Sequence, residues 1–108
     1  MVASRVLIAC LGASLSFPLL AAEKKGDPAK GKEVFEQCAV CHNATTKEKK
    51  MAVSLMGLYK RAKLASGKRV TDANVRARIN EGGGGMPAYQ ELLSDDEKAN
   101  LLAYLKTL

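Results

Sequence analysis

The stretch CAVCHN, residues 38–43, gathers most of the sulfur and imidazole groups of the chain. The 108-residue chain has three cysteines and one histidine. Two of those cysteines and the histidine, Cys38, Cys41 and His42, lie within this short stretch, whereas Cys10 lies in an apolar segment near the start. Such a set is too sparse for a disulfide framework and too small for a metal site built from protein ligands alone.

Four chemistries use residues of this kind. A structural zinc site needs four Cys or His ligands, and this stretch supplies only three. A thioredoxin-like Cys-x-x-Cys pair belongs near a βαβ pattern, which the sequence does not show. A plain disulfide between Cys38 and Cys41 would close a very short loop and constrain little of the unfolded chain. The order Cys-x-x-Cys-His is instead the attachment motif of c-type haem.

This spacing has a physical reason in haem attachment. Two thiols about one helical turn apart can both reach the vinyl groups on one edge of a porphyrin. The histidine that follows is then held beneath the iron, and the porphyrin supplies the large apolar body that a small chain lacks. We therefore expect Cys38 and Cys41 to attach one haem c covalently and His42 to ligate its iron.

The second axial ligand follows less directly from the residues. His42 is the only histidine, which excludes bis-histidine ligation within one chain and leaves a methionine, an open site or a lysine. Met51 and Met56 lie close to His42 in sequence, and Met56 suits a core-filling role. Met86 lies in the extended-looking stretch GGGGMPAY, where glycines permit close backbone approach and Pro87 stiffens the loop. Because methionine/histidine ligation of haem is well established, we favour Met86 over Met51 and Met56.

The start of the chain resembles an export signal. Arg5 is followed by an uncharged apolar run over residues 6–22, after which the sequence turns abruptly polar. This order predicts a cleaved signal peptide over residues 1–22 and one domain over residues 23–108, located in the periplasm without stable membrane insertion. The alternative is an uncleaved membrane anchor, for which the run is short and Pro18 is unfavourable.

The rest of the sequence predicts an all-α domain with about four short helices. Asp27 and Pro28 are typical of a helix start, and Thr71 or Asp72 begins a second clear helix. Ser94 and Glu97 form a capping box before the last helix. A short apolar segment over residues 53–62 predicts one more helix, after a polar loop over residues 43–51. The positions expected to face inward are Gly31, Val34, Phe35, Cys38, Val75, Ile79, Leu101, Tyr104, Leu105 and Leu108.

The charge distribution is uneven. The formal net charge is +6, and residues 47–69 carry Glu48 as their single acidic residue among Lys47, Lys49, Lys50, Lys60, Arg61, Lys63, Lys68 and Arg69. Export and the scarcity of interleaved aromatic residues argue against nucleic acid as the partner. We expect this segment to meet redox proteins with acidic docking surfaces, and an ordinary solvated face is the alternative.

Over essentially the whole predicted domain, the chain resembles small bacterial class I cytochromes c. The resemblance rests on Gly31 and Phe35, the haem motif, Leu58, Met86 with Pro87, and Leu101 with Tyr104. It implies a class I cytochrome c fold wrapped around one covalent haem, in which Gly31 and Phe35 of the first helix cross Leu101 and Tyr104 of the last. Arg61 resembles the residue that pairs with a haem propionate in that family.

One position departs from the family. A proline often stands where this chain has Val53, and its carbonyl orients the imidazole that ligates the iron. The carbonyl of Val53 can still accept that hydrogen bond, so the ligation by His42 is expected to survive.

The resemblance implies a monomeric electron-transfer protein and not an enzyme. With both axial positions filled, the iron can exchange single electrons but cannot bind a substrate, and the sole histidine is committed to the iron. Two alternatives stay open at this point. One is a haem c subunit of a larger periplasmic oxidoreductase, and the other is a haem protein that binds a small molecule at a labile methionine site.

Overall fold

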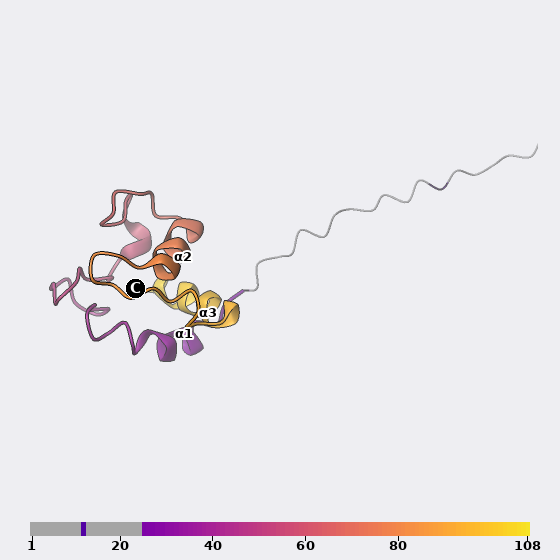
Figure 1. Cartoon of the computed structure of the whole chain (residues 1–108), viewed down its shortest axis with the longest axis horizontal. Helices are drawn as coiled ribbons and strands as arrows, with labels where there is room; N and C mark the ends of the chain where they lie inside the picture. Colours follow the sequence, from indigo (N-terminus) through magenta and orange to yellow (C-terminus); the bar gives the residue numbers. More distant parts are fainter. Residues whose placement is uncertain (1–11, 13–24) are drawn as a thin grey trace, which may run out of the picture.

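Three α-helices and one 3₁₀ turn make up the regular structure of the protein. The computed structural model describes residue 12 and residues 25–108, so nearly all of the expected signal peptide lies outside the described residues. The elements are α1 (Pro28–Phe35), the 3₁₀ turn η1 (Leu58–Lys60), α2 (Asp72–Glu81) and α3 (Asp95–Leu105) (Figure 1). Within the described part of the chain the only β-type pairing consists of two isolated bridges. The predicted all-α class is confirmed.

A further helix was expected over residues 53–62, but only the three residues of η1 are helical there. Gly57, directly before it, has a positive φ of 70°, which a right-handed helix cannot include. The segment between α1 and α2 is therefore a long irregular connection interrupted by this one turn.

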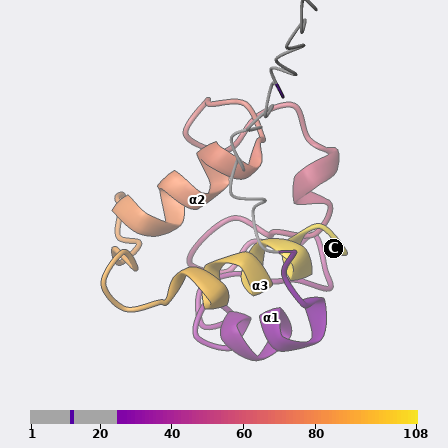
Figure 2. The same cartoon turned by 90° about the vertical axis from the view of Figure 1, so that its right-hand side faces the viewer.

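Helices α1 and α3 lie against each other, as Figure 2 shows. A Cβ atom on Gly31 would lie 1.9 Å from the backbone oxygen of Asn100, so only glycine permits this approach. One turn further on, the rings of Phe35 and Tyr104 pack with their centroids 5.3 Å apart. The expected crossing of the first and last helices is confirmed.

The helix starts follow the local sequence signals. The Asp27 side chain accepts a hydrogen bond from the Ala29 amide at 2.9 Å, and Pro28 occupies the first helical position. Ser94 and Glu97 form the complete capping box at the start of α3. The backbone amide of Asp27 also donates to Asn100 Oδ1 at 2.8 Å, which ties the first helix start to the middle of α3.

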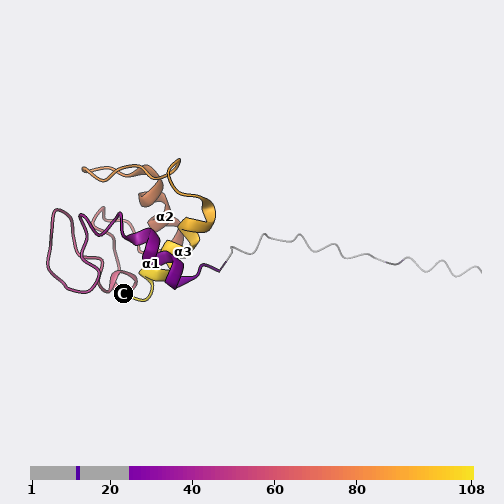
Figure 3. The same cartoon turned by 90° about the horizontal axis from the view of Figure 1, so that it is seen from below.

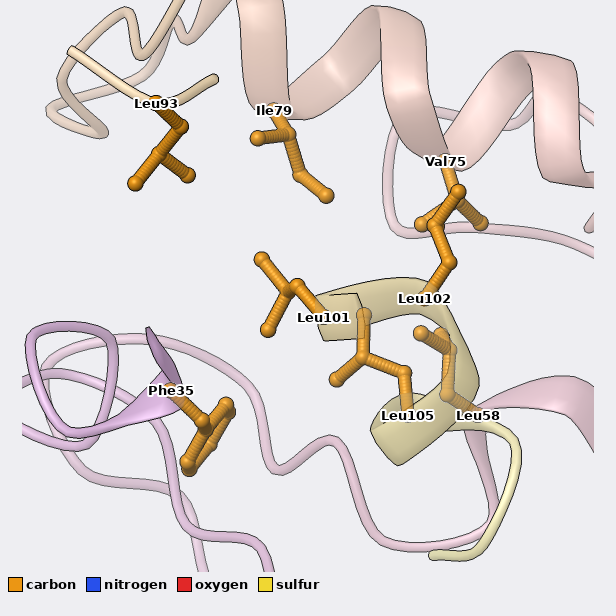
Figure 4. Packing of buried hydrophobic residues seen from close by; sticks show 8 residues of the cluster. All are labelled: Phe35, Leu58, Val75, Ile79, Leu93, Leu101, Leu102 and Leu105. Atoms are coloured by element: carbon orange, nitrogen blue, oxygen red, sulfur yellow. The ribbon is translucent and has the colours of Figure 1, made fainter. Parts of the chain in front are cut away.

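The buried apolar residues form one cluster between the three helices (Figure 4). Leu102 and Leu93 belong to it, although neither was among the residues expected to face inward. Leu108 was expected in the stripe of α3 but lies beyond the end of the helix at Leu105 and is only partly buried. The cluster comprises Phe35, Leu58, Val75, Ile79, Leu93, Leu101, Leu102 and Leu105.

A polar contact joins η1, the start of α2 and the end of α3. The Tyr59 hydroxyl donates to Asp72 Oδ1 at 2.9 Å, and Lys106 Nζ donates to Asp72 Oδ2 at 2.9 Å. The bond from Lys106 lowers the pKa of Asp72, while burial and the bond to Asp72 raise the pKa of Tyr59. Lys106 also lies 5.5 Å from the Tyr59 ring centroid, in range of a cation–π contact.

Candidate functional site

A cavity of about 390 Å³ is lined by all four residues singled out from the sequence: Cys38, Cys41, His42 and Met86. Much of its remaining wall is aliphatic, from Leu55, Leu58, Leu64, Val75, Ile79 and Leu105. In Figure 3 the return segment after α2, in orange, runs along the top of the domain, and the segment after α1, in purple and magenta, lies below it on the left. The tertiary structure thus brings together residues that are far apart in the sequence.

The segment after α1 places both thiols one turn apart. Helix α1 ends at Phe35, but tight turns continue from it. The Cys38 amide donates to the Phe35 carbonyl at 2.8 Å, and the amides of Cys41 and His42 both donate to the Cys38 carbonyl, at 3.1 and 2.9 Å. This compact backbone brings the two sulfur atoms and the imidazole to the same cavity.

The His42 ring is oriented by a backbone carbonyl. His42 Nδ1 lies 2.6 Å from the carbonyl oxygen of Val53. Because a carbonyl can only accept a hydrogen bond, Nδ1 carries a proton, and in the neutral ring the lone pair is then on Nε2. A hydrogen bond of this kind from the second ring nitrogen is the usual partner arrangement of a metal-ligating histidine. The expectation that the Val53 carbonyl can accept the hydrogen bond from His42 is confirmed.

Ser54 and Arg61 hold the segment that carries this carbonyl. Ser54 is buried, and its hydroxyl contacts the carbonyls of Thr46 and Asn43 and accepts from the Met56 amide. Arg61 Nη2 donates to the carbonyls of Ser54 and Met56, both at 2.8 Å. The Val53 carbonyl is therefore fixed by contacts on the residues that directly follow it.

The glycine-rich stretch is a tight hairpin turn and not the extended segment expected from the sequence. The Gly83 amide donates to the Met86 carbonyl at 2.9 Å, and the Met86 amide donates to the Gly83 carbonyl at 3.1 Å. Gly84 and Gly85, between them, have φ values of 60° and 90°, as in a type I′ turn. Beyond Pro87, the Tyr89 amide donates to the Ile79 carbonyl at 2.9 Å. The chain thus returns along α2, and the turn presents Met86 to the cavity.

The three methionines within residues 25–108 differ in their relation to the cavity. Met86 lines it and packs against the apolar cluster. Met51 also lines it but is 82% exposed, and Met56, 37% exposed, does not line it. Among these three, Met86 alone combines a place in the cavity wall with partial burial.

The two cysteines are free thiols in the structure. Burial, and to a lesser extent Cys41, raises the pKa of the Cys38 thiol. In the described part of the chain no group of three or more His, Cys, Asp and Glu side chains could hold a metal ion.

Arg78, Tyr89 and Ser54 contribute to the site but were not singled out from the sequence. Arg78 and Tyr89 line the cavity, and burial together with the two cysteines raises the pKa of Tyr89. Arg78 lies in the last turn of α2, and a basic residue at such a position often bonds the terminal carbonyls, so a sequence signal existed. No comparable sequence signal identifies Ser54 as a residue of the site.

Across residues 12 and 25–108, none of the helices has the length and apolar character required to cross a membrane.

Comparison with known proteins places the chain among haem proteins. Residues 26–105 match the family described as cytochrome c oxidase, cbb3-type, subunit III. The chain is 30% identical over 81 residues to cytochrome c6 of Diacronema lutheri, an alignment that covers 74% of this chain and 94% of that protein. The crystal structure of cytochrome c6 from the diatom Phaeodactylum tricornutum matches with a TM-score of 0.59 at 29% identity, covering 76% of this chain and 93% of that one.

The glycine turn yields a stability prediction. Gly82 has a φ of 65°, and a Cβ there would lie 2.4 Å from the Met86 carbonyl oxygen. Gly67 also has a positive φ, of 89°, but a Cβ there would meet nothing within 4 Å. We expect Gly67→Ala to cost about 1 kcal/mol, for backbone strain alone, and Gly82→Ala about 2–4 kcal/mol, because overpacking adds to the strain. Denaturant unfolding measures both, and equal losses would contradict the close packing of Gly82 on Met86.

Proposed function

The chain belongs to the cytochrome c family as a small class I c-type cytochrome with one covalently bound haem c, and we propose that Cys38, Cys41, His42 and Met86 hold this haem. The thiols of Cys38 and Cys41 form the two thioether links. The imidazole of His42 and the thioether sulfur of Met86 would hold the iron. The protein is an electron carrier, as its cytochrome c6 relatives indicate.

The observation that carries the assignment is the shared cavity wall. His42 and Met86 are far apart in the sequence, yet both line one largely aliphatic cavity together with the two thiols. The donor set fits the group as well, because one imidazole and one thioether are established ligands of haem iron in cytochromes c. The residues present therefore suit a covalently bound haem.

When bound, the haem iron supplies one-electron exchange between its ferric and ferrous forms. The residues of this chain orient the ligands and exclude water. Val53 keeps the proton on His42 Nδ1 through the 2.6 Å hydrogen bond, which leaves Nε2 free to coordinate. The aliphatic wall provides a surrounding of low polarity, which together with a methionine ligand favours a high reduction potential. Arg61, at the cavity wall, is available to pair with a propionate.

The comparisons favour a single carrier over a subunit of a larger enzyme. The matching family is named for an oxidase subunit, but the chain covers 94% and 93% of two cytochromes c6. The two relatives are therefore nearly as long as the part of this chain from residue 25 onward. We infer that the protein acts as a monomeric shuttle and is not itself an enzyme, because its one histidine serves the iron and leaves no catalytic base of that type.

The partners of this shuttle are redox proteins with acidic docking surfaces. All basic residues of the segment 47–69 are exposed, and two of them, Lys49 and Arg61, line the cavity. Met51, 82% exposed, and Val53, 39% exposed, supply apolar surface beside them. Positive charges around an apolar contact suit brief, electrostatically steered association. With residues 1–22 as a cleaved signal peptide, the carrier works in the periplasm.

The attachment residues can be tested by the haem content of the exported protein. In a host with haem-ligation machinery, we expect His42→Ala to yield no holo-protein, because the iron loses the ligand next to its covalent anchor. Cys38→Ala and Cys41→Ala should each lower the covalently bound haem, since one thioether is lost. Cys10→Ala, a control outside the predicted domain, should leave the haem content unchanged. Normal holo-protein from His42→Ala would refute the ligand assignment.

The second ligand can be tested by the reduction potential. Met86→Ala should keep the haem attached but lower the potential, by on the order of 100 mV, because a methionine ligand favours the reduced iron. Met51→Ala, in the same cavity wall but highly exposed, is the matched control and should change the potential little. If the potential of the Met86 variant equals that of the wild type, the role belongs to Met51 or Met56.

The docking surface can be tested by the salt dependence of electron transfer. The second-order rate with an acidic redox protein should fall by about tenfold from low to high salt, because screening removes the steering. Lys49→Gln should lower the rate at low salt more than Lys30→Gln does. Lys30 is an exposed residue of α1, and its variant removes the same charge at a different place. A rate that does not respond to salt, or equal effects of the two variants, would rule out this surface.

A further inference from the structure

The side chain of Arg78 contacts the turn that carries Met86. Its guanidinium atom Nη2 donates to the Gly83 carbonyl oxygen at 3.0 Å. The same oxygen accepts the Met86 amide at 3.1 Å. A carbonyl oxygen has two lone pairs and can accept both bonds. One atom of Gly83 therefore connects the Arg78 side chain directly to the backbone of Met86.

Arg78 also contacts the turn through its own backbone. Its carbonyl accepts the Gly82 amide at 2.9 Å, which closes the C-terminal end of α2. The side chain then passes close to the glycines that follow, since a Cβ on Gly83 would lie 3.2 Å from Arg78 Nη1. One residue thus bonds both the start of the turn and the carbonyl at its base.

The turn itself has few other means of holding its shape. All four residues over 82–85 are glycines with positive φ, and Gly83, Gly84 and Gly85 are exposed. Glycine loses more conformational freedom on ordering than any other residue, and it has no side chain to pack. A turn of this composition needs support from another element, and Arg78 supplies a charged donor, which makes a stronger hydrogen bond than a neutral one.

We propose that Arg78 is a positioning residue that holds the glycine turn so that the sulfur of Met86 stays on the iron. This inference rests on the proposed role of Met86 as a ligand and adds the residue that keeps the ligand in place. Arg78 belongs to α2, whose Val75 and Ile79 are buried in the core. Its bond to Gly83 therefore connects the turn to the core of the domain. When the bond to Gly83 is lost, Met86 leaves the iron more often.

Carbon monoxide binding to the reduced holo-protein measures how often the methionine leaves, because the gas binds only at a free iron position. In Arg78→Met, which keeps a similar length and helix propensity but lacks donor and charge, the binding rate should rise about fivefold, since one charge-assisted hydrogen bond is removed. The weak red absorption band of the oxidised iron–methionine bond should weaken in parallel. Arg78→Gln, a second variant that is polar, should also raise the binding rate and weaken the red band.

The matched control is Arg76→Met, which removes the same charge from the same helix. Arg76 lies near Asp95, with its Nη1 3.9 Å from Asp95 Oδ1. The variant Arg76→Met should leave the rate of carbon monoxide binding and the red absorption band unchanged. If Arg78→Met changes them no more than Arg76→Met does, or lowers only the unfolding midpoint, the inference is wrong and Arg78 has a merely structural or general electrostatic role.

Met86→Ala in the same assay separates this inference from the proposed function. If Met86→Ala binds carbon monoxide rapidly and Arg78→Met does not, Met86 is the ligand and only the role of Arg78 fails. If Met86→Ala itself leaves gas binding slow, the assignment of the ligand fails first and the role of Arg78 with it.

Discussion

The crossing of α1 on α3 is the contact on which the rest of the domain depends. At Gly31 the two backbones approach so closely that a single Cβ would reach 1.9 Å from the Asn100 oxygen. The ring pair Phe35–Tyr104 and the bond from Asp27 to Asn100 lie on either side of this point. Because α1 leads directly into the turns that carry Cys38 to His42, this crossing sets where the thiols and the imidazole meet the cavity.

The small core of the domain is consistent with a cofactor at its centre. The buried cluster holds eight apolar residues, of which only Leu101 is fully buried among the larger side chains. Several members, Leu58, Val75, Ile79 and Leu105, also line the cavity. These residues therefore face the cavity as well as the helices, and a chain of this size gains from an apolar body bound there what its own side chains do not supply.

Arginine side chains bond the backbone beside the carbonyl partner of His42 and the turn that carries Met86. Arg61 bonds the carbonyls of Ser54 and Met56, next to the Val53 carbonyl that orients His42. Arg78 bonds the carbonyl of Gly83, next to Met86. Arginine suits this task because its planar guanidinium offers several donors in a fixed arrangement. Irregular segments thus carry His42 and Met86, and Arg78 of α2 bonds one of them.

Local interactions explain what the sequence alone determined. The spacing of Cys38, Cys41 and His42, the start of α1 at Pro28 and the capping box of Ser94 depend on residues within one or two turns of each other, and they predicted the class of fold and the cofactor. The tertiary structure decided that η1 is a single turn, that Leu102 is buried and that the glycine stretch folds into a hairpin. It also decided that Arg78 contacts the turn of Met86. These outcomes depend on the docking of separate segments around one cavity, and neither periodicity nor spacing along the chain contains that information.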